Sequence, residues 1–264
     1  MANISQAKRL VIKIGTSSLT YENGKLNLRK MDELCRTLTD LKNSGREIIL
    51  VTSGAIGVGV GKMGLSKRPE ETAKKQALAA IGQCELMFMY DKFFGEYNQT
   101  AAQILLTKNV TDMPQSRLNV QNTFEELLSM GVIPVINEND TVETAELEGE
   151  HFGDNDMLSA IVSSVVSADA LVILTDTDGL YDSDPRTNEN AQIIRHVQKV
   201  TDEIELLAGG KGSSRGTGGM STKVKAARYV TEHGISCFVI NGGRMKNLYD
   251  LTEHKEIGTC FWAQ

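Results

Sequence analysis

The sequence predicts an α/β protein, a three-layer α/β/α sandwich in which helices cover both faces of a mainly parallel sheet. Short apolar runs such as 9–15 (RLVIKIG) and 170–176 (ALVILTD) alternate with longer amphipathic stretches, which is typical of β-α-β units. Glycine and polar residues gather directly after several of these runs. With 264 residues, 41% of them hydrophobic, the chain can bury a sizeable core, and we expect a single domain over residues 1–264.

The expected elements follow one another in a regular order. Apolar runs bounded by turn residues are predicted as strands at 9–15, 46–54, 101–108, 132–140, 170–176, 236–241 and 257–261. Stretches with apolar residues at helical spacing are predicted as helices at about 27–44, 76–97, 115–130, 154–167, 220–233 and 244–252. Residues 141–152 and 186–200 break this pattern, and each is expected to form a projecting hairpin or flap.

Composition and charge narrow the functional class. A net charge of −6 argues against a general nucleic-acid surface but allows a local basic pocket for an anionic small molecule. No apolar run is long enough to span a membrane, and the first residues lack the apolar core of a secretory signal, so we expect a soluble cytoplasmic protein. The cysteines and histidines are scattered and form no C-x-x-C pair, which predicts buried free thiols and no metal site.

Glycine-rich segments mark the candidate ligand site. They are GTSS (15–18), SGAIGVG (53–59) and GTGGMSTK (216–223). Glycine backbones can turn several N–H groups toward one anion, so three such clusters at strand ends or helix starts favour phosphate binding, although each alone is equally well a simple turn.

Two common nucleotide-binding motifs do not account for these glycines. A P-loop would need serine or threonine after Lys62, where Met63 stands. A G-x-G-x-x-G match over 59–64 begins several residues after its strand, which is the wrong place for a dinucleotide-binding turn.

Two lysines strengthen the phosphate interpretation. Lys13 lies inside an apolar strand, where a charge is costly unless it meets a partner. Lys223 falls in the first turn of the helix predicted over 220–233, the end at which the helix dipole disfavours a cation. Cations beside phosphate-binding turns are what phosphoryl transfer requires, although each lysine alone could be solvated. The turns after four strands should share one edge of the sheet, because ligands bind beyond the carboxyl ends of parallel strands.

Several blocks of the sequence resemble the amino acid kinase family. They are VIKIGTSSL, VTSGAIGVG, VIPVINEND, FGDNDMLSA, LTDTDGLYDSDPR and GTGGMSTKVKAA, spread over residues 11–227. The resemblance implies an amino-acid-binding half over about 1–167 and a nucleotide-binding half over about 168–264. It implies ATP-dependent phosphorylation of the γ-carboxylate of L-glutamate to L-glutamyl 5-phosphate, the first step of proline biosynthesis. The alternatives are a kinase for acetylglutamate or aspartate and, from another class, a catalytically silent amino-acid or nucleotide sensor.

The resemblance also assigns roles to residues. The catalytic residues would be Lys13, Lys223 and Asp156. The substrate-binding residues would be Ser53, Gly54, Ala55, Asp140 and Asn155. The nucleotide-binding residues would be Lys13, Gly15, Thr16, Thr175, Asp176, Thr217, Gly218, Gly219, Met220, Ser221, Thr222 and Lys223.

Elementary chemistry is consistent with these roles. The γ-carboxylate of glutamate has a pKa of about 4.3 and needs no general base. Asp140 could bind the α-ammonium group, whereas Ser53 and Asn155 could donate hydrogen bonds to the α-carboxylate. Asp154 is better explained as a helix cap, and the acidic run 176–185 lacks calcium-loop spacing. Magnesium is expected to arrive with ATP, held by phosphates and water.

The expected partners are L-glutamate and ATP with Mg²⁺, proline as a feedback inhibitor, and further copies of the chain in a dimer or tetramer, as is usual in the family. No nucleic acid or membrane is expected. The sequence ends at Gln264, soon after the last predicted strand, so the PUA domain that many bacterial members carry there is not expected.

Overall fold

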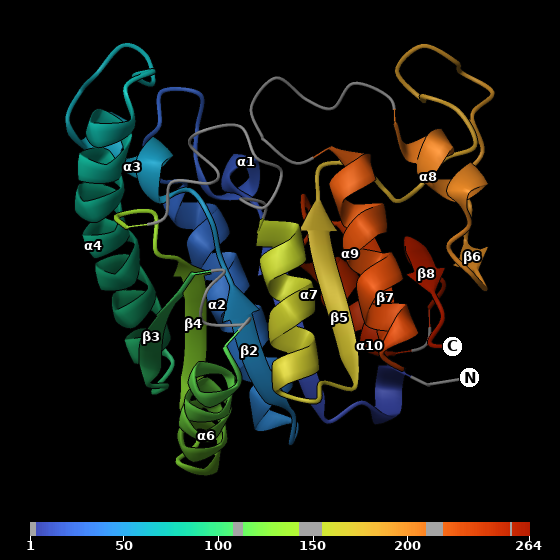
Figure 1. Cartoon of the computed structure of the whole chain (residues 1–264), viewed down its shortest axis with the longest axis horizontal. Helices are drawn as coiled ribbons and strands as arrows, with labels where there is room; N and C mark the ends of the chain where they lie inside the picture. Colours follow the sequence, from blue (N-terminus) through green and yellow to red (C-terminus); the bar gives the residue numbers. More distant parts are fainter. Residues whose placement is uncertain (1–3, 108–112, 143–154, 210–218, 254) are drawn as a thin grey trace.

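One eight-stranded sheet forms the centre of the protein in a computed structural model that describes residues 4–107, 113–142, 155–209, 219–253 and 255–264 (Figure 1). The strands are β1 (Arg9–Ile14), β2 (Glu47–Val51), β3 (Ala101–Leu106), β4 (Ile133–Glu138), β5 (Ala170–Thr175), β6 (His196–Val197), β7 (Ser236–Asn241) and β8 (Thr259–Phe261). The helices are a 3-10 turn (Ile4–Gln6), α1 (Thr16–Leu19), α2 (Leu28–Asn43), α3 (Ala55–Lys62), α4 (Thr72–Glu96), α6 (Pro114–Ser129), α7 (Asn155–Val165), α8 (Asp202–Ala208), α9 (Met220–Glu232) and α10 (Lys246–Thr252).

The sheet is mainly parallel, as predicted. Its strand order is β3-β4-β2-β1-β5-β7-β8-β6, and only the β7–β8 pair is antiparallel within it. The central strand β1 pairs with β2 on one side and β5 on the other. Such a central parallel strand is buried on both faces, which explains its almost continuous apolar sequence.

Two apolar cores separate the three layers. Side chains alternate between the faces of a strand, so Leu10, Ile12 and Ile14 of β1 pack with α2, α4 and α10 in one core. Val11 of β1 packs with α6, α7 and α9 in the other. Figure 1 shows α6, α7 and α9 on the near face of the sheet and α2 behind it. The same alternation directs Lys13 to the face that α7 and α9 cover.

The glycine segment 53–59 is the largest difference from the predicted elements. Only Gly54 has the left-handed backbone expected of a phosphate-binding loop, with φ of 101°, and the following residues form helix α3. A Cβ on Gly59 would lie 2.1 Å from the carbonyl oxygen of Leu78 in α4. The phosphate-loop interpretation is therefore wrong for the glycines inside α3, because Gly59 lets two helices pack closely.

Gly82 provides the matching contact on α4, and its substitution tests this packing. A Cβ there would lie 1.8 Å from the carbonyl oxygen of Ala55, so Gly82→Ala should lower the free energy of unfolding by about 1–3 kcal/mol. Gly95→Ala in the same helix is the matched control, since its Cβ would meet no atom within 4 Å. Urea unfolding followed by circular dichroism measures both; equal stability of the two variants would contradict the close packing.

The two predicted flaps have different outcomes. Most of the first, 141–152, lies outside the described residues. In the second region, an antiparallel bridge joins Tyr181 to Ile193, and the chain between them forms a projecting hairpin. Residues His196–Val197 instead add the edge strand β6, too short to be recognised from its sequence pattern. Helix α8 was also not predicted.

The cysteines are free, as predicted, and Cys35, Cys237 and Cys260 are buried. Burial raises the pKa of the Cys260 thiol to about 12. Cys84 is exposed on α4, so the expectation of a buried thiol is wrong there. Within the described residues, no helix combines the length and apolarity needed to cross a bilayer.

Candidate active site

The turns after β1, β2, β4 and β5 lie at the same edge of the sheet. The parallel registers pair Lys13 with Val51, Val51 with Ile136, and Ile14 with Leu174, so these strands end at one level. The predicted convergence of polar turns at this edge is thus confirmed. Figure 1 places it at the top, where the arrowhead of β5 points and α1 lies.

Lys13 is buried one residue before the end of β1. The residue is only 5% exposed, and its Nζ lies 2.6 Å from Oδ1 of Asp156 in the first turn of α7. A buried ammonium group is costly without an opposite charge, and α7 supplies that charge from the face toward which Lys13 points. The partial positive charge at the N-terminus of α7 also favours a carboxylate in the first turn of this helix.

Lys223 reaches the same carboxylate from α9. It is 6% exposed, and its Nζ donates to Oδ2 of Asp156 over 3.0 Å. Lys13, Asp156 and Lys223, here called the charged trio, therefore join three elements that are far apart in the sequence. The cost of a lysine at the start of α9 is offset by the neighbouring Asp156.

The charged trio sets the ionisation of Asp156. Complete burial would raise the pKa of this carboxyl, but the charges and hydrogen bonds of Lys13 and Lys223 outweigh burial and hold its pKa well below the usual range. Asp156 is thus an anion at neutral pH, and one carboxylate between two ammonium groups leaves the trio with a net positive charge. Such a centre suits an anionic ligand with oxygens to share between two ammonium groups.

Thr222 adds a hydroxyl to the trio. Its Oγ1 lies 2.8 Å from Oδ2 of Asp156 and 2.8 Å from the carbonyl oxygen of Gly219, the N-cap of α9. Met220 and Ser221 lie half-buried in the same first turn. The resemblance had assigned Thr222 to nucleotide binding; its contact with Asp156 was not predicted. Thr217 and Gly218 lie outside the described residues.

The predicted substrate residues after β2 adjoin the turn after β1. Ser53 Oγ lies 3.2 Å from Thr16 Oγ1, and Ser53 also donates to the carbonyl oxygen of Ile14 over 3.2 Å. A Cβ on Gly54 would lie 2.9 Å from a methyl group of Thr16, so the left-handed glycine permits this close approach. Ala55 follows as the buried first residue of α3.

Asn155 and Asp140 reach the edge from α7 and from the turn after β4. Both N–H bonds of the Asn155 amide are used, since Nδ2 donates to the carbonyl oxygen of Thr52 over 3.0 Å and to Oδ1 of Asn137 over 3.1 Å. Asn155 therefore offers a ligand its Oδ1 acceptor rather than the donor that we expected from the sequence. Asp140 is half-buried two residues after β4 ends. Asp154, the expected cap, lies outside the described residues.

The remaining predicted nucleotide residues follow β1 and β5. Gly15 lies beside the charged trio, because a Cβ there would be 3.7 Å from Nζ of Lys13. Thr175 ends β5 as a buried residue and donates to Asp176 over 3.2 Å, whereas Asp176 is exposed.

Sequence reasoning missed two buried amides beside this edge. Asn137, at the end of β4, donates through Nδ2 to Oε1 of Gln83 on α4 over 2.8 Å. A glutamine among the buried residues Ala79, Gly82 and Leu86 of one helix is the signal that could have revealed it, because a buried amide needs hydrogen-bond partners.

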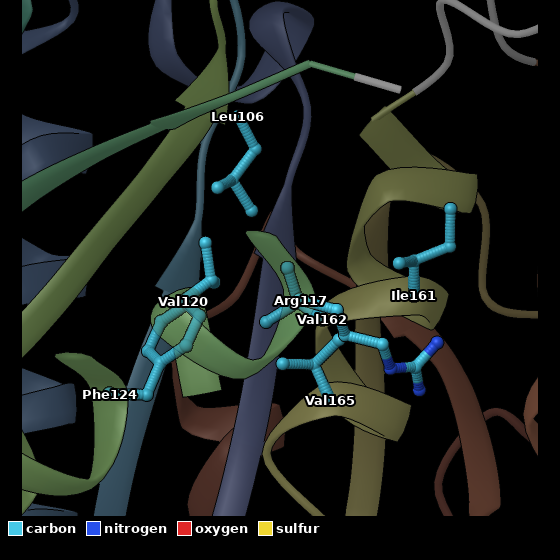
Figure 2. A pocket seen from close by; sticks show the side chains of 7 residues that line it. All are labelled: Leu106, Arg117, Val120, Phe124, Ile161, Val162 and Val165. Atoms are coloured by element: carbon cyan, nitrogen blue, oxygen red, sulfur yellow. The ribbon is translucent and has the colours of Figure 1, made fainter. Parts of the chain in front are cut away.

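An apolar recess elsewhere has a different character. It lies between α6 and α7 and has room for about one water molecule (Figure 2). Its lining consists of Leu106, Arg117, Val120, Phe124, Ile161, Val162 and Val165. Arg117 donates to Ser164 over 3.2 Å. The recess has no carboxylate or hydroxyl in its lining, so we place the candidate active site at the charged trio.

Comparisons with known proteins agree with this architecture. Solved structures with similar folds include UMP kinase from Bacillus anthracis, with a TM-score of 0.65 at 15% identity, covering 98% of this chain and 97% of that one. Isopentenyl phosphate kinase from T. acidophilum has a TM-score of 0.61 at 16% identity, covering 96% of this chain and 100% of that one. At these identities the likeness concerns the fold alone.

Sequence relatives are much closer. The glutamate 5-kinase of Clostridium perfringens is 52% identical over 99% of this chain and 97% of its own length. That of Enterococcus faecalis (strain ATCC 700802 / V583) is 51% identical over 98% of this chain and 96% of its own length. A family profile described as "Amino acid kinase family" matches residues 8–241. With that profile over most of its length and relatives of this identity, the chain belongs to the amino acid kinase family.

Proposed function

We propose that the protein transfers the γ-phosphoryl group of ATP to the γ-carboxylate of L-glutamate, forming ADP and L-glutamyl 5-phosphate. The charged trio at the carboxyl edge of the sheet carries this proposal. Two buried ammonium groups contact one carboxylate there, from β1 and α9, and can share the oxygens of a phosphoryl group. The names of the relatives, which are about half identical over nearly the whole chain, support glutamate as the acceptor.

The chemistry needs positioning and charge stabilisation rather than proton transfer. A γ-carboxylate oxygen of glutamate attacks the γ-phosphorus, a new oxygen–phosphorus bond forms, and the bond from that phosphorus to the oxygen bridging to ADP breaks. Because the attacking carboxylate is already ionised at neutral pH, no residue has to remove a proton. Negative charge on the transferred and bridging oxygens is what Lys13 and Lys223 would stabilise.

Asp156 would hold both lysines in place. Its Oδ1 contacts Lys13 and its Oδ2 contacts Lys223, so one rigid carboxylate orients the two ammonium groups. This arrangement lowers the cost of organising them during the reaction. Asp156 would thus be a positioning residue for the two groups that touch the phosphoryl oxygens.

The residues present fit ATP accompanied by Mg²⁺. The magnesium ion would supply further charge neutralisation on the phosphates. Both oxygens of Asp156 already contact ammonium groups, whose charge would repel a cation, so Asp156 is a poor magnesium ligand. We propose that the ion is bound mainly by phosphate oxygens and water, and that the turns holding Gly15, Thr175 and Asp176, with the start of α9, surround the nucleotide.

A hydroxamate-trapping assay tests the reaction and its acceptor. With ATP and Mg²⁺ present, L-glutamate should give a trapped acyl phosphate more efficiently than N-acetyl-L-glutamate or L-aspartate. A higher kcat/KM for N-acetyl-L-glutamate or L-aspartate would mean that this acid, and not L-glutamate, is the acceptor. If none of the acids gives an acyl phosphate, the result would favour a catalytically silent sensor. Adding L-proline to the same assay tests feedback inhibition, and light scattering tests the predicted dimer or tetramer.

Asp140 tests how the α-ammonium group is recognised. Asp140→Ala should raise the KM for L-glutamate by roughly 10- to 100-fold with a smaller effect on kcat, because a charge-assisted hydrogen bond contributes about equally to the bound substrate and the transition state. Steady-state kinetics measures the KM for L-glutamate in this variant. The control is Asp91→Ala, at an exposed position on α4. An unchanged KM would remove Asp140 from the substrate site.

A further inference from the structure

Three amide side chains, two of them buried and the third half-buried, form a hydrogen-bonded row beside the candidate substrate site. Gln83 on α4, Asn137 on β4 and Asn155 on α7 lie in that order, with Asn137 in the middle. Gln83 is 8% exposed and Asn137 is 1% exposed. Amides at such positions must satisfy most of their hydrogen bonds within the protein or with a ligand.

Backbone groups determine the orientation of every amide in the row. Asn155 Nδ2 donates to the carbonyl oxygen of Thr52, which can only accept. The N–H of Glu138, which can only donate, bonds to Asn137 Oδ1 over 2.9 Å. Asn137 must therefore present its Nδ2 to Gln83, and Gln83 must accept through Oε1 over 2.8 Å.

With this orientation, one donor group and one acceptor atom of the row have no hydrogen-bond partner among the described residues. Gln83 Nε2 and Asn155 Oδ1 are both buried, and neither has a hydrogen-bond partner in the part of the chain that the structure describes. Leaving a buried amide group unsatisfied is unfavourable, so such atoms point to a ligand that completes them. Carboxylate oxygens of a ligand would accept a hydrogen bond from Gln83 Nε2, and an ammonium group would donate one to Asn155 Oδ1.

The residues that carry these atoms adjoin the segment that follows β2. The residue before Gln83, Gly82, packs against the carbonyl of Ala55, the first residue of α3. On the other side, Asn155 is bonded to Thr52, which directly precedes Ser53 and Gly54. The first N–H groups of α3 and its dipole favour an anion at the same place.

We propose that Gln83 is a substrate-binding residue whose Nε2 donates to the α-carboxylate of the amino acid, while Asn155 Oδ1 accepts from its α-ammonium group. The leftover donor and acceptor flank the single Asn137 amide, and the two complementary groups of a free α-amino acid are attached to a single carbon. This inference rests on the proposed function and adds the residue that recognises the α-carboxylate. Gln83 has no part in phosphoryl transfer itself.

Two substitutions separate the donor from the support that Gln83 gives to Asn137. Gln83→Glu keeps an oxygen that accepts from Asn137 Nδ2 and replaces only the donor Nε2 with a second oxygen. Gln83→Met removes both the donor and the acceptor. In each variant the KM for L-glutamate should rise roughly 10- to 100-fold, the range expected for a hydrogen bond to a charged group, with the KM for ATP within about twofold of the wild type. Gln103→Met, at an exposed position of β3, is the matched control.

A substrate analogue identifies the group that Gln83 recognises. The compound 4-aminobutyrate is glutamate without its α-carboxylate, so its inhibition constant against glutamate turnover should be the same for wild type and Gln83→Met. The unliganded melting temperature of Gln83→Glu should also stay close to that of the wild type, because this variant keeps an acceptor for Asn137 Nδ2.

Three results would overturn the inference. The KM for glutamate could stay unchanged, which would mean that Nε2 binds only water. The KM values for glutamate and ATP could rise together with a lowered melting temperature, or 4-aminobutyrate binding could weaken as much as glutamate binding; either would indicate a purely structural role. Glutamate turnover by the wild type in the same assay tests the proposed function separately, since it can stand while the Gln83 variants fail to respond.

Discussion

Lys223→Ala is expected to lower kcat by roughly 10²- to 10³-fold, the loss typical for removing one preorganised group that stabilises developing charge. The KM for both substrates should change much less, because the interaction of Lys223 with the phosphoryl oxygens strengthens in the transition state. The fold should be retained, since Asp156 keeps its contact with Lys13 at 2.6 Å. Single-turnover kinetics measures the chemical step, and circular dichroism measures the fold.

Lys225→Ala is the matched control for this variant. Lys225 lies on the same helix, α9, two residues further along, and its side chain is exposed. It should therefore retain nearly wild-type kcat. Turnover by Lys223→Ala at the wild-type rate would remove Lys223 from the phosphoryl-transfer site and with it the main support for the proposed function.

Asp156→Ala is expected to affect stability as well as activity. It removes the anion that Lys13 and Lys223 contact, and breaking a buried ion pair by deleting one partner typically costs about 3–5 kcal/mol. The activity should also fall steeply, because the two ammonium groups lose their common support. Urea unfolding without ligands measures the stability.

The control for Asp156→Ala is Asp202→Ala, which removes an ion pair with Arg228 in which the aspartate side chain is 91% exposed. Exposed ion pairs contribute about 0–1 kcal/mol, so this variant should remain near wild-type stability. If Asp156→Ala unfolds with the same free energy as Asp202→Ala, the charged trio does not stabilise the fold.

Acid titration provides a second measure of Asp156. Its pKa is lowered in the folded protein, so its stabilising contribution is fully present above the unfolded pKa of about 3.9 and is lost as the pH falls through the lower folded value. The stability difference between wild type and Asp156→Asn should therefore be constant from about pH 5 to 8 and shrink only below about pH 4. A difference that already shrinks near pH 6 would contradict the lowered pKa.

Local patterns predicted the architecture because each element carries its own periodicity. The apolar runs became the buried parallel strands, and the helix predicted over 220–233 was found at Met220–Glu232. Prediction failed where packing rather than periodicity decides, as in α3, whose glycines resemble a loop in sequence but lie at a close contact between two helices. Elements as short as β6 contain too few residues to show a period.

The candidate site was predictable to the extent that its residues conflict with their local surroundings. A lysine in an apolar strand and another at a helix start are both unfavourable alone, so each indicated a ligand or a partner. Gln83 gave a weaker signal, since one glutamine in a long helix has several ordinary explanations. Its importance became visible only when its hydrogen-bond partners were known.

The sequence by itself determined the layered α/β architecture, the strand ends at which the polar turns lie, and the two lysines around which the site is built. The tertiary structure alone decided that each lysine contacts a different oxygen of Asp156, that Asn155 presents an acceptor, and that Gln83 Nε2 has no hydrogen-bond partner among the described residues. The physical reason is that periodicity and backbone preference act between neighbours in the chain, whereas ionisation and hydrogen-bond orientation depend on groups that only folding brings together.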